Sequence, residues 1–386
     1  MTSPPAAPRP DPPPRDRTGL RTGFTTGACA AAAAKAAARM LVRGDASASI
    51  ETTLPNGSRV SFPLARSERA DDRAIASVIK DAGDDPDCTH GAEIVAEVVL
   101  SGQSGVVLHG GPGVATVTKP GLGLEVGGPA INAVPRRNIT EMVLEELAGS
   151  AWNGAVVTIS VPGGEEMAKK TTNARLGLLG GISILGTSGI VKPFSTAAYR
   201  ASVVQAIDVA RERGIEELVL TTGGKSELYA MKLHPHLPED AFVQVGDFVG
   251  TGLRHCARRQ ARRAVVVGMM GKLSKMADGK MMTHAAGSEV NMELLSTLAG
   301  ELGADDELCA AIRAANTARH VLELCAVRGL VGITSLVCRR VVEHGQAHAG
   351  GSLAVQAYLV DFDGKLLGGY PSASPGADCL GGTERP

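Results

Sequence analysis

The hydrophobic pattern of the chain opens with a long helix. Residues 28–42 are dominated by alanine, a composition that favours an α-helix over a strand. Thr25 or Thr26 stands where an N-cap is needed, and Gly44 stands where such a helix would end. We therefore predict a helix whose first amides point toward whatever lies beside Thr26 and Gly27.

Strand patterns follow this helix. Apolar and polar residues alternate over 50–54 and 60–64, and Asn56-Gly57 between them is typical of the turn of a β-hairpin. The same criteria indicate strands at 94–100 and 155–161 and a helix at 139–147 that Asn138 would cap. The first domain, residues 19–194, is therefore expected to be of mixed α+β type.

After Pro193 the pattern becomes a regular alternation of helices and strands. The predicted order is helix 196–213, strand 218–222, helix 227–233, strand 242–245, helix 249–260 and strand 264–267. Such alternation implies parallel strands joined by crossover helices. We predict an α/β protein of two domains, in which a Rossmann-like parallel-sheet domain over residues 195–350 follows the α+β domain. A strand within 351–368 is expected to return to the first domain.

Composition bounds the size of the chain and the character of its ends. With 386 residues the chain is long enough for two domains. Residues 1–18 are rich in proline and cannot bury enough apolar surface to offset the entropy of ordering, so we expect a disordered tail there. Residues 369–386 are expected to form a second flexible tail.

Charge and residue usage exclude several classes of function. The 39 Lys and Arg nearly cancel the 40 Asp and Glu, so no global field draws the protein to polyanions or membranes. Aromatic residues make up 3% of the chain, which leaves few rings to stack on bases, and no apolar run approaches the length of a membrane-spanning helix. Seven cysteines without a CxxC pair argue against a zinc framework and favour a reducing cytoplasm.

A glycine-rich segment, residues 169–190, is the least ordinary part of the pattern. Five glycines stand among leucines and isoleucines, where each costs stability unless the backbone must be approached closely. Lys169, Lys170, Arg175 and Thr187 would supply donors to an anionic ligand. The alternative is a tight turn packed between layers of sheet.

Several short segments together resemble one family. They are Gly23-Phe24-Thr25-Thr26-Gly27, the segment 169–190, Lys80–Asp87, Thr118–Leu124, Gly271-Lys272-Leu273 and Thr283-His284. In these segments the chain resembles the cobalt-precorrin-5B C(1)-methyltransferases. The resemblance extends from about residue 20 to about residue 368. The chain departs from the pattern of that family at Met269 and at Ala285-Ala286.

The resemblance implies a reaction and its reactants. Enzymes of this family methylate carbon 1 of cobalt-precorrin-5B to give cobalt-precorrin-6A in anaerobic adenosylcobalamin (vitamin B12) biosynthesis. The resemblance also implies that S-adenosylmethionine is the methyl donor and that cobalt takes part only as a component of the tetrapyrrole substrate. Neighbouring pathway enzymes are possible partners. The donor would lie in the second domain, with the tetrapyrrole across an interdomain cleft.

Glycine-rich loops after the predicted strands are the candidates for binding the donor. Ligands of open parallel sheets bind beyond the carboxyl ends of the strands, so these loops are expected to line one crevice. The candidate residues are Gly223, Gly224, Ser226, Gly246, Asp247, Gly268, Gly271 and Lys272. Asp247 would accept hydrogen bonds from ribose hydroxyls or from an ammonium group. Ordinary strand-to-helix turns are the alternative, and the absence of GxGxxG argues against a standard dinucleotide site.

Carboxylates of the tetrapyrrole would be held by cations and by a helix N-terminus. Besides Thr187, the candidates are Thr25, Thr26, Gly27, Lys119, Arg136, Arg137, Lys169, Lys170 and Arg175. The pair Arg136-Arg137 would serve equally well in a solvated turn.

Acidic residues and histidines supply the candidates for acid-base chemistry. The acidic group Asp81, Asp84, Asp85 and Asp87 with His90 suits a general base or a divalent cation, and equally a charged turn. The resemblance places Asp84 or Asp85 beside the substrate, and His284 would tune protonation near pH 7. The pair His234 and His236 around Pro235 invites a metal-binding interpretation, but a surface loop is favoured, so no metal site is predicted.

Two other classes of function remain open from the sequence. A nucleotide-binding phosphotransferase would also use glycine-rich turns and helix starts, although GxxxxGK[ST] is absent. A non-catalytic tetrapyrrole carrier would use the same cationic surface without donor loops.

Overall fold

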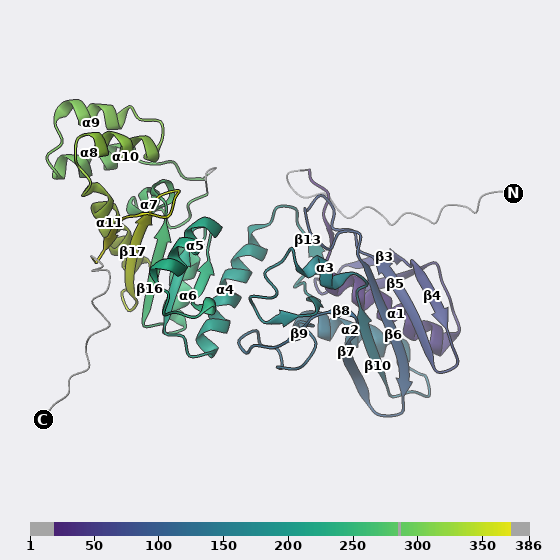
Figure 1. The fold of residues 1–386 in the computed structure, drawn as a ribbon. Coiled ribbons are helices and arrows are strands. Elements are labelled where there is room, and N and C mark those ends of the chain that lie inside the picture. The colour runs from purple at the N-terminus through teal and green to yellow at the C-terminus, as the bar shows by residue number, and fades with distance from the viewer. Residues whose placement is uncertain (1–18, 285–286, 372–386) are drawn as a thin grey trace, which may run out of the picture. The chain divides into compact units, whose positions relative to one another are not determined.

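The computed structural model describes residues 19–284 and 287–371, and the chain divides into two compact units after Thr196. Both units mix helices with sheets (Figure 1). No helix among the described residues is long and apolar enough to cross a membrane. The tail predicted over residues 1–18 lies outside the described residues, as do residues 372–386 and Ala285-Ala286.

The first unit is built on a five-stranded sheet. Its strands have the order β4-β5-β6-β10-β7, in which β7 and β10 are parallel and the other neighbours antiparallel. The strands are β4 (Arg66–Arg69), β5 (Arg73–Ile79), β6 (Glu93–Ser101), β7 (Gly105–Gly110) and β10 (Gly154–Ser160). Burial alternates along β6 and β10, because one face of the sheet packs against helices.

Helix α1 (Thr26–Arg43) covers that face together with α2 (Ala133–Leu147) (Figure 1). Thr25 caps α1 by accepting a hydrogen bond from the amide of Ala28 at 3.2 Å, and Gly44 ends the helix with φ of 71°. Alanine side chains let the helix lie close to β5 and β6, so nearly all of it is buried. The predicted alanine helix is confirmed.

Short elements complete the first unit. The hairpin predicted around Gly57 is confirmed as β2 (Ser49–Thr53) and β3 (Arg59–Pro63). Helix α3 (Gly164–Ala168) follows β10. Three two-stranded pairs are β1 (Gly23–Phe24) with β13 (Ile190–Val191), β9 (Thr116–Val117) with β11 (Leu178–Leu179), and β8 (Gly113–Val114) with β12 (Gly181–Ile182).

The predicted start of the second helix is wrong. Helix α2 begins at Ala133 with Asn132 as N-cap, and Pro135 lies in its first turn, where proline is tolerated. Asn138 lies inside the helix, where its side-chain amide donates to the carbonyl oxygen of Thr53 at 2.9 Å. A contact distant in the sequence therefore explains the residue that resembles a cap.

The second unit is built on a sheet of the order β15-β14-β16-β17-β18. The first four strands are parallel neighbours and β18 is antiparallel. They are β14 (Glu217–Thr221), β15 (Phe242–Gln244), β16 (Arg263–Gly268), β17 (Ala354–Val360) and β18 (Leu366–Tyr370). Strand β14 is buried throughout, since helices pack on both faces of the sheet.

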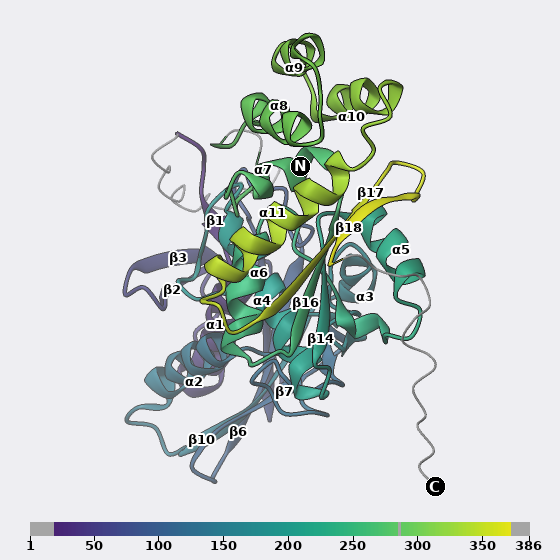
Figure 2. The same ribbon diagram turned by 90° about the vertical axis from the view of Figure 1, so that its left-hand side faces the viewer.

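Helices of the second unit surround this sheet. Figure 2 shows α11 lying along β17 and β18, with α8, α9 and α10 gathered beyond it. The helices are α4 (Thr196–Glu212), α5 (Gly224–Leu233), α6 (Val249–Arg258), α7 (Met270–Ala277), α8 (Met292–Glu301), α9 (Asp306–Arg313), α10 (Ala318–Val327) and α11 (Ile333–His348), with a 3-10 turn at Glu239–Ala241.

Two predictions about the end of the chain are wrong. The strand predicted within 351–368 does not return to the first unit, because β17 pairs with β16 over Ala354–Leu359 and β16 is a strand of the second unit. The apolar residues of β17 suit a strand covered on both faces. The tail predicted from residue 369 begins inside β18, which runs to Tyr370.

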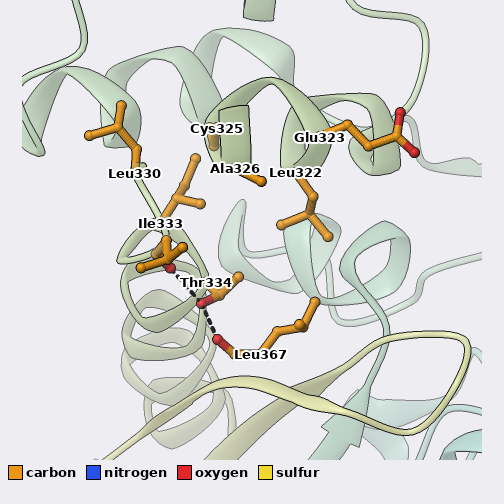
Figure 3. Close-up of a pocket in the computed structure, with 9 residues that line it drawn as sticks. Leu322, Glu323, Cys325, Ala326, Leu330, Ile333, Thr334 and Leu367 are labelled. Atoms are coloured by element: carbon orange, nitrogen blue, oxygen red, sulfur yellow. Dashed lines mark hydrogen bonds between the residues drawn. The ribbon is translucent and has the colours of Figure 1, made fainter. Parts of the chain in front are cut away.

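An apolar pocket of about 240 Å³ lies between α10, α11 and β18 (Figure 3). The hydroxyl of Thr334, one of its few polar groups, already donates to the carbonyl oxygen of Leu367 at 2.7 Å and lies 3.0 Å from that of Val331. None of the candidate residues predicted from the sequence lines this pocket. Its apolar lining does not match a substrate that carries many carboxylates.

Candidate functional site

Three loops of the second unit meet where parallel strands end. Strand β14 lies between β15 and β16, so the segments that follow these strands are neighbours at one edge of the sheet. They are Thr222-Gly223, Val245–Asp247 and the start of α7 after Met269. The structure therefore brings together the candidate donor-binding residues at the edge where open parallel sheets bind ligands.

Lys272 joins the three loops directly. Its ammonium group donates to the carbonyl oxygen of Thr222 at 2.8 Å and pairs with Oδ1 of Asp247 at 3.0 Å. Thr283 adds to the same group, because its hydroxyl donates to Oδ1 of Asp247 at 3.0 Å. Lys275 holds Thr283 by donating to its carbonyl oxygen at 3.1 Å. We call Thr222, Asp247, Lys272 and Thr283 the strand-edge group.

The carboxyl group of Asp247 is tuned by these contacts. Partial burial favours the protonated form, but the hydrogen bonds from Lys272 and Thr283 outweigh it and hold the pKa of Asp247 below its ordinary value. The nearby His284 acts in the same direction when it is charged. Asp247 is therefore an ionised hydrogen-bond acceptor at neutral pH.

Glycines at this edge serve two different purposes. A side chain at Gly223 or Gly271 would meet nothing within 4 Å, so both leave open space beside the strand-edge group. A side chain at Gly268 would overlap Leu273, and one at Gly246, which has φ of 55°, would lie 2.8 Å from the hydroxyl of Tyr199. Close packing therefore explains why glycine is needed at Gly246 and Gly268.

Two further candidates lie at the start of α5. The hydroxyl of Ser226 donates to the carbonyl oxygen of Gly223 at 2.8 Å and lies 3.5 Å from that of Thr222. Gly224 is exposed and has little beside it except the side chain of Gln244. Ser226 therefore shapes the loop, and Gly224 forms part of its surface.

Three polar residues that the sequence did not single out, Tyr199, Glu227 and Gln244, flank the same edge. Glu227 on α5 is 6% exposed and accepts a hydrogen bond from the side chain of Gln244. The hydroxyl of Tyr199 donates to the carbonyl oxygen of Gln244 at 3.3 Å. Burial, followed by the charges of Asp247 and Glu227, raises the pKa of Tyr199. Gln244 could have been found from its place as the last residue of a strand.

The glycine-rich segment of the first unit packs on the start of α1. Thr26 accepts a hydrogen bond from the amide of Leu185 at 2.9 Å, and the amide of Gly27 donates to the carbonyl oxygen of Leu185 at 3.0 Å. A side chain at Gly186 would overlap Thr25. These contacts occupy the groups that were expected to face a ligand, while Thr187 stays exposed.

Several candidate cations of the first unit have separate partners within the chain. Lys119 donates to the carbonyl oxygen of Arg175 at 3.0 Å. Elsewhere Lys169 pairs with Glu166, Arg137 lies 3.8 Å from Glu141 on α2, and Lys170 and Arg136 are exposed. Their assignment to the substrate stays a prediction.

Asp84 and Asp85 hold backbone amides. Oδ2 of Asp84 accepts from the amide of Arg21 at 2.7 Å, and Oδ1 of Asp85 accepts from the amide of Phe194 at 2.8 Å. The catalytic role predicted for the two carboxylates stays a prediction, as does that of His284. His284 is exposed beside the strand-edge group.

The second unit defines a class of protein with a mixed α/β fold and a polar, glycine-lined surface beyond its parallel strands, the place where ligands of open parallel sheets bind. Two family models match the chain, one described as CbiD over residues 14–193 and one described as CbiD, C-terminal domain, over residues 282–371. The chain belongs to the CbiD family.

Curated relatives are similar over most of the chain. A cobalt-precorrin-5B C(1)-methyltransferase of Leptospira interrogans serovar copenhageni is 59% identical and covers 87% of this chain and 92% of its own. A protein of the same name from Thermus thermophilus is 53% identical, with 94% and 97% covered. A crystal structure of a cobalamin biosynthesis protein (cbiD) from Archaeoglobus fulgidus is 30% identical, covers 65% of this chain and 77% of that chain, and gives a TM-score of 0.36.

Proposed function

We propose that this chain transfers a methyl group from S-adenosylmethionine to carbon 1 of cobalt-precorrin-5B, giving cobalt-precorrin-6A. The observation that carries the proposal is the 59% identity over 87% of the chain to a cobalt-precorrin-5B C(1)-methyltransferase. Cobalt enters the reaction only within the substrate. The free cysteines among the described residues favour the cytoplasm as its location.

The donor is proposed to bind at the strand-edge group. Four parallel strands with helices on both faces support the Rossmann-like description of this unit. S-adenosylmethionine carries ribose hydroxyls and an ammonium group, which suit the ionised Asp247 and the buried Glu227 as acceptors. Gly223 and Gly271 leave open space for the donor, so the residues present fit it.

The donor supplies a methyl group on a positively charged sulfur. No nucleophilic side chain is needed to transfer it, and positioning alone can supply about 7–11 kcal/mol of the barrier. Lys272 fixes the two loops that carry Thr222 and Asp247. We propose that it is a positioning residue. We propose that His284, which lies close enough to Asp247 to act on its charge, handles any proton at this edge.

The carboxylates of the tetrapyrrole are proposed to meet the cations of the first unit. Arg136 and Arg137 lie near the start of α2, where exposed guanidinium groups and the helix dipole both favour anions. Lys170 and Thr187 are exposed as well.

Mass spectrometry with a methyl-labelled donor tests the proposed function. The protein, cobalt-precorrin-5B and labelled S-adenosylmethionine are expected to give a product that is heavier by one labelled methyl group, and fragmentation should place that group at carbon 1. Binding of the tetrapyrrole without any mass gain would select a carrier. A labelled methyl group at another carbon would contradict the proposed position.

A further inference from the structure

A group of metal-ligating side chains lies at the opposite edge of the same sheet, where the parallel strands begin. Glu217 is the first residue of β14, His234 follows the last residue of α5, and His236 lies two residues further along. One ligand atom from each residue, two imidazole nitrogens and a carboxylate oxygen, lies within 4.8 Å of the other two. This is the one such group of three found among the described residues.

Backbone hydrogen bonds fix the two histidines in this arrangement. The amide of His234 donates to the carbonyl oxygen of Ala230 at 2.9 Å, and the amide of Leu237 donates to that of His234 at 3.1 Å. The resulting turn holds the imidazole rings with their centroids 6.0 Å apart. Tyr358 walls one side, with its ring centroid 5.7 Å from that of His234.

The imidazole of His234 provides an independent observation that points to a ligand. His234 is 9% exposed, and its Nε2 is buried without a hydrogen-bond partner. Buried polar atoms are normally satisfied, so an orphaned nitrogen on an imidazole that lies beside a second imidazole and a carboxylate needs an explanation. Coordination of a metal ion supplies the missing partner.

The ligand atoms that remain available select the kind of metal. Glu217 is also 9% exposed. Its Oε2 lies 3.2 Å from Nη1 of Arg263 and 3.8 Å from Nη2 of Arg262, so two guanidinium groups share its carboxylate. Such a site offers too few free oxygens for Mg²⁺ or Ca²⁺, which take six or more oxygen ligands. Two imidazoles with one carboxylate suit Zn²⁺, Co²⁺ or Ni²⁺.

We propose that Glu217, His234 and His236 bind one divalent transition metal ion of this class. The exposed side chain of His236 can turn to close the distances to the roughly 2.0–2.1 Å of a metal–nitrogen bond. The ion ties the start of β14 to the connection between α5 and β15. The proposal does not depend on the methyltransferase function, because it concerns the other edge of the sheet. It departs from the expectation of no metal site.

A titration with Co²⁺ tests the proposal on the full-length protein after treatment with a chelator. We expect one Co²⁺ per chain by equilibrium dialysis and mass spectrometry, with a visible spectrum typical of nitrogen and oxygen ligands. His236→Ala and Glu217→Gln should each weaken binding by more than about tenfold. His320→Ala, which changes an exposed histidine on α10, should leave binding unchanged.

Three results would overturn the proposal. They are less than one bound ion per chain, equal binding by wild type and His236→Ala, and a thiolate-to-cobalt charge-transfer band that assigns the metal to cysteine. Thermal unfolding without metal controls for misfolding, because His236 is exposed and its replacement should leave the metal-free melting temperature unchanged.

Discussion

At the scale of single residues, Lys272 is the side chain on which the proposed donor site depends. It contacts a carbonyl oxygen of one loop and a carboxylate of another while standing on the helix that follows a third strand. Spacing in the sequence does not reveal this link, because the two contacts of Lys272 lie 50 and 25 residues away. It follows only from the order of the parallel strands.

Lys272→Met should weaken donor binding. Loss of a hydrogen bond to a charged group costs about 1.5–3 kcal/mol, so the dissociation constant for S-adenosylhomocysteine is expected to rise at least about tenfold in titration calorimetry. Lys280→Met is the matched control, since Lys280 is similarly exposed and pairs with Asp278 at 2.9 Å. An equal loss in both variants, or none in Lys272→Met, would contradict the positioning role.

Asp247 should make stability depend on pH. Its pKa lies below the ordinary value of 3.8 in the folded state, so its contribution is present above about pH 3.8 and is lost as the pH falls through the lower folded-state pKa. Between roughly pH 6 and roughly pH 3, urea unfolding of the wild type should lose more free energy than that of Asp247→Asn. Asp363→Asn changes an exposed carboxyl group and should behave as the wild type.

At the scale of elements, local patterns predict well wherever neighbouring residues decide the structure. The alanine helix has its cap at Thr25 and its end at Gly44 within the pattern itself, and both are confirmed. Asn138 resembles a cap, but its side chain donates a hydrogen bond to the carbonyl oxygen of Thr53. The predicted strand within 351–368 pairs with β16, about ninety residues earlier in the chain. The local pattern of residues does not predict such long-range partners.

Gly186→Ala should destabilise the first unit more than Gly180→Ala. Both glycines have positive φ, 135° and 82°, so alanine is strained at each position by about 1–3 kcal/mol. The alanine at position 186 would also overlap Thr25, which should add about 1–3 kcal/mol, whereas position 180 has open space around it.

Urea unfolding followed by the fluorescence of Trp152 measures this difference. Trp152 is the only tryptophan and belongs to the first unit. Equal losses of unfolding free energy in the two variants would show that residue 186 does not press on the start of α1.

At the scale of the whole molecule, the three candidate sites were predictable to different degrees. The donor loops could be grouped from the sequence because an alternation of strands and helices implies parallel strands, whose carboxyl ends share one edge. No comparable rule predicts from the sequence which cations of the first unit lie together. The structure gives several of them separate partners. The metal group could not be predicted, because it is recognised by the burial of His234 and its unpartnered Nε2. The sequence shows only two histidines around Pro235 and does not reveal that burial.

A crystal structure with S-adenosylhomocysteine measures the central claim most directly. We predict that the ligand lies beyond the carboxyl ends of β14, β15 and β16. Its ribose or ammonium group should be within hydrogen-bond distance of Asp247, and the ligand should contact the backbone of Gly223. Density for the ligand at any other place, with the edge around Lys272 empty, would contradict the account.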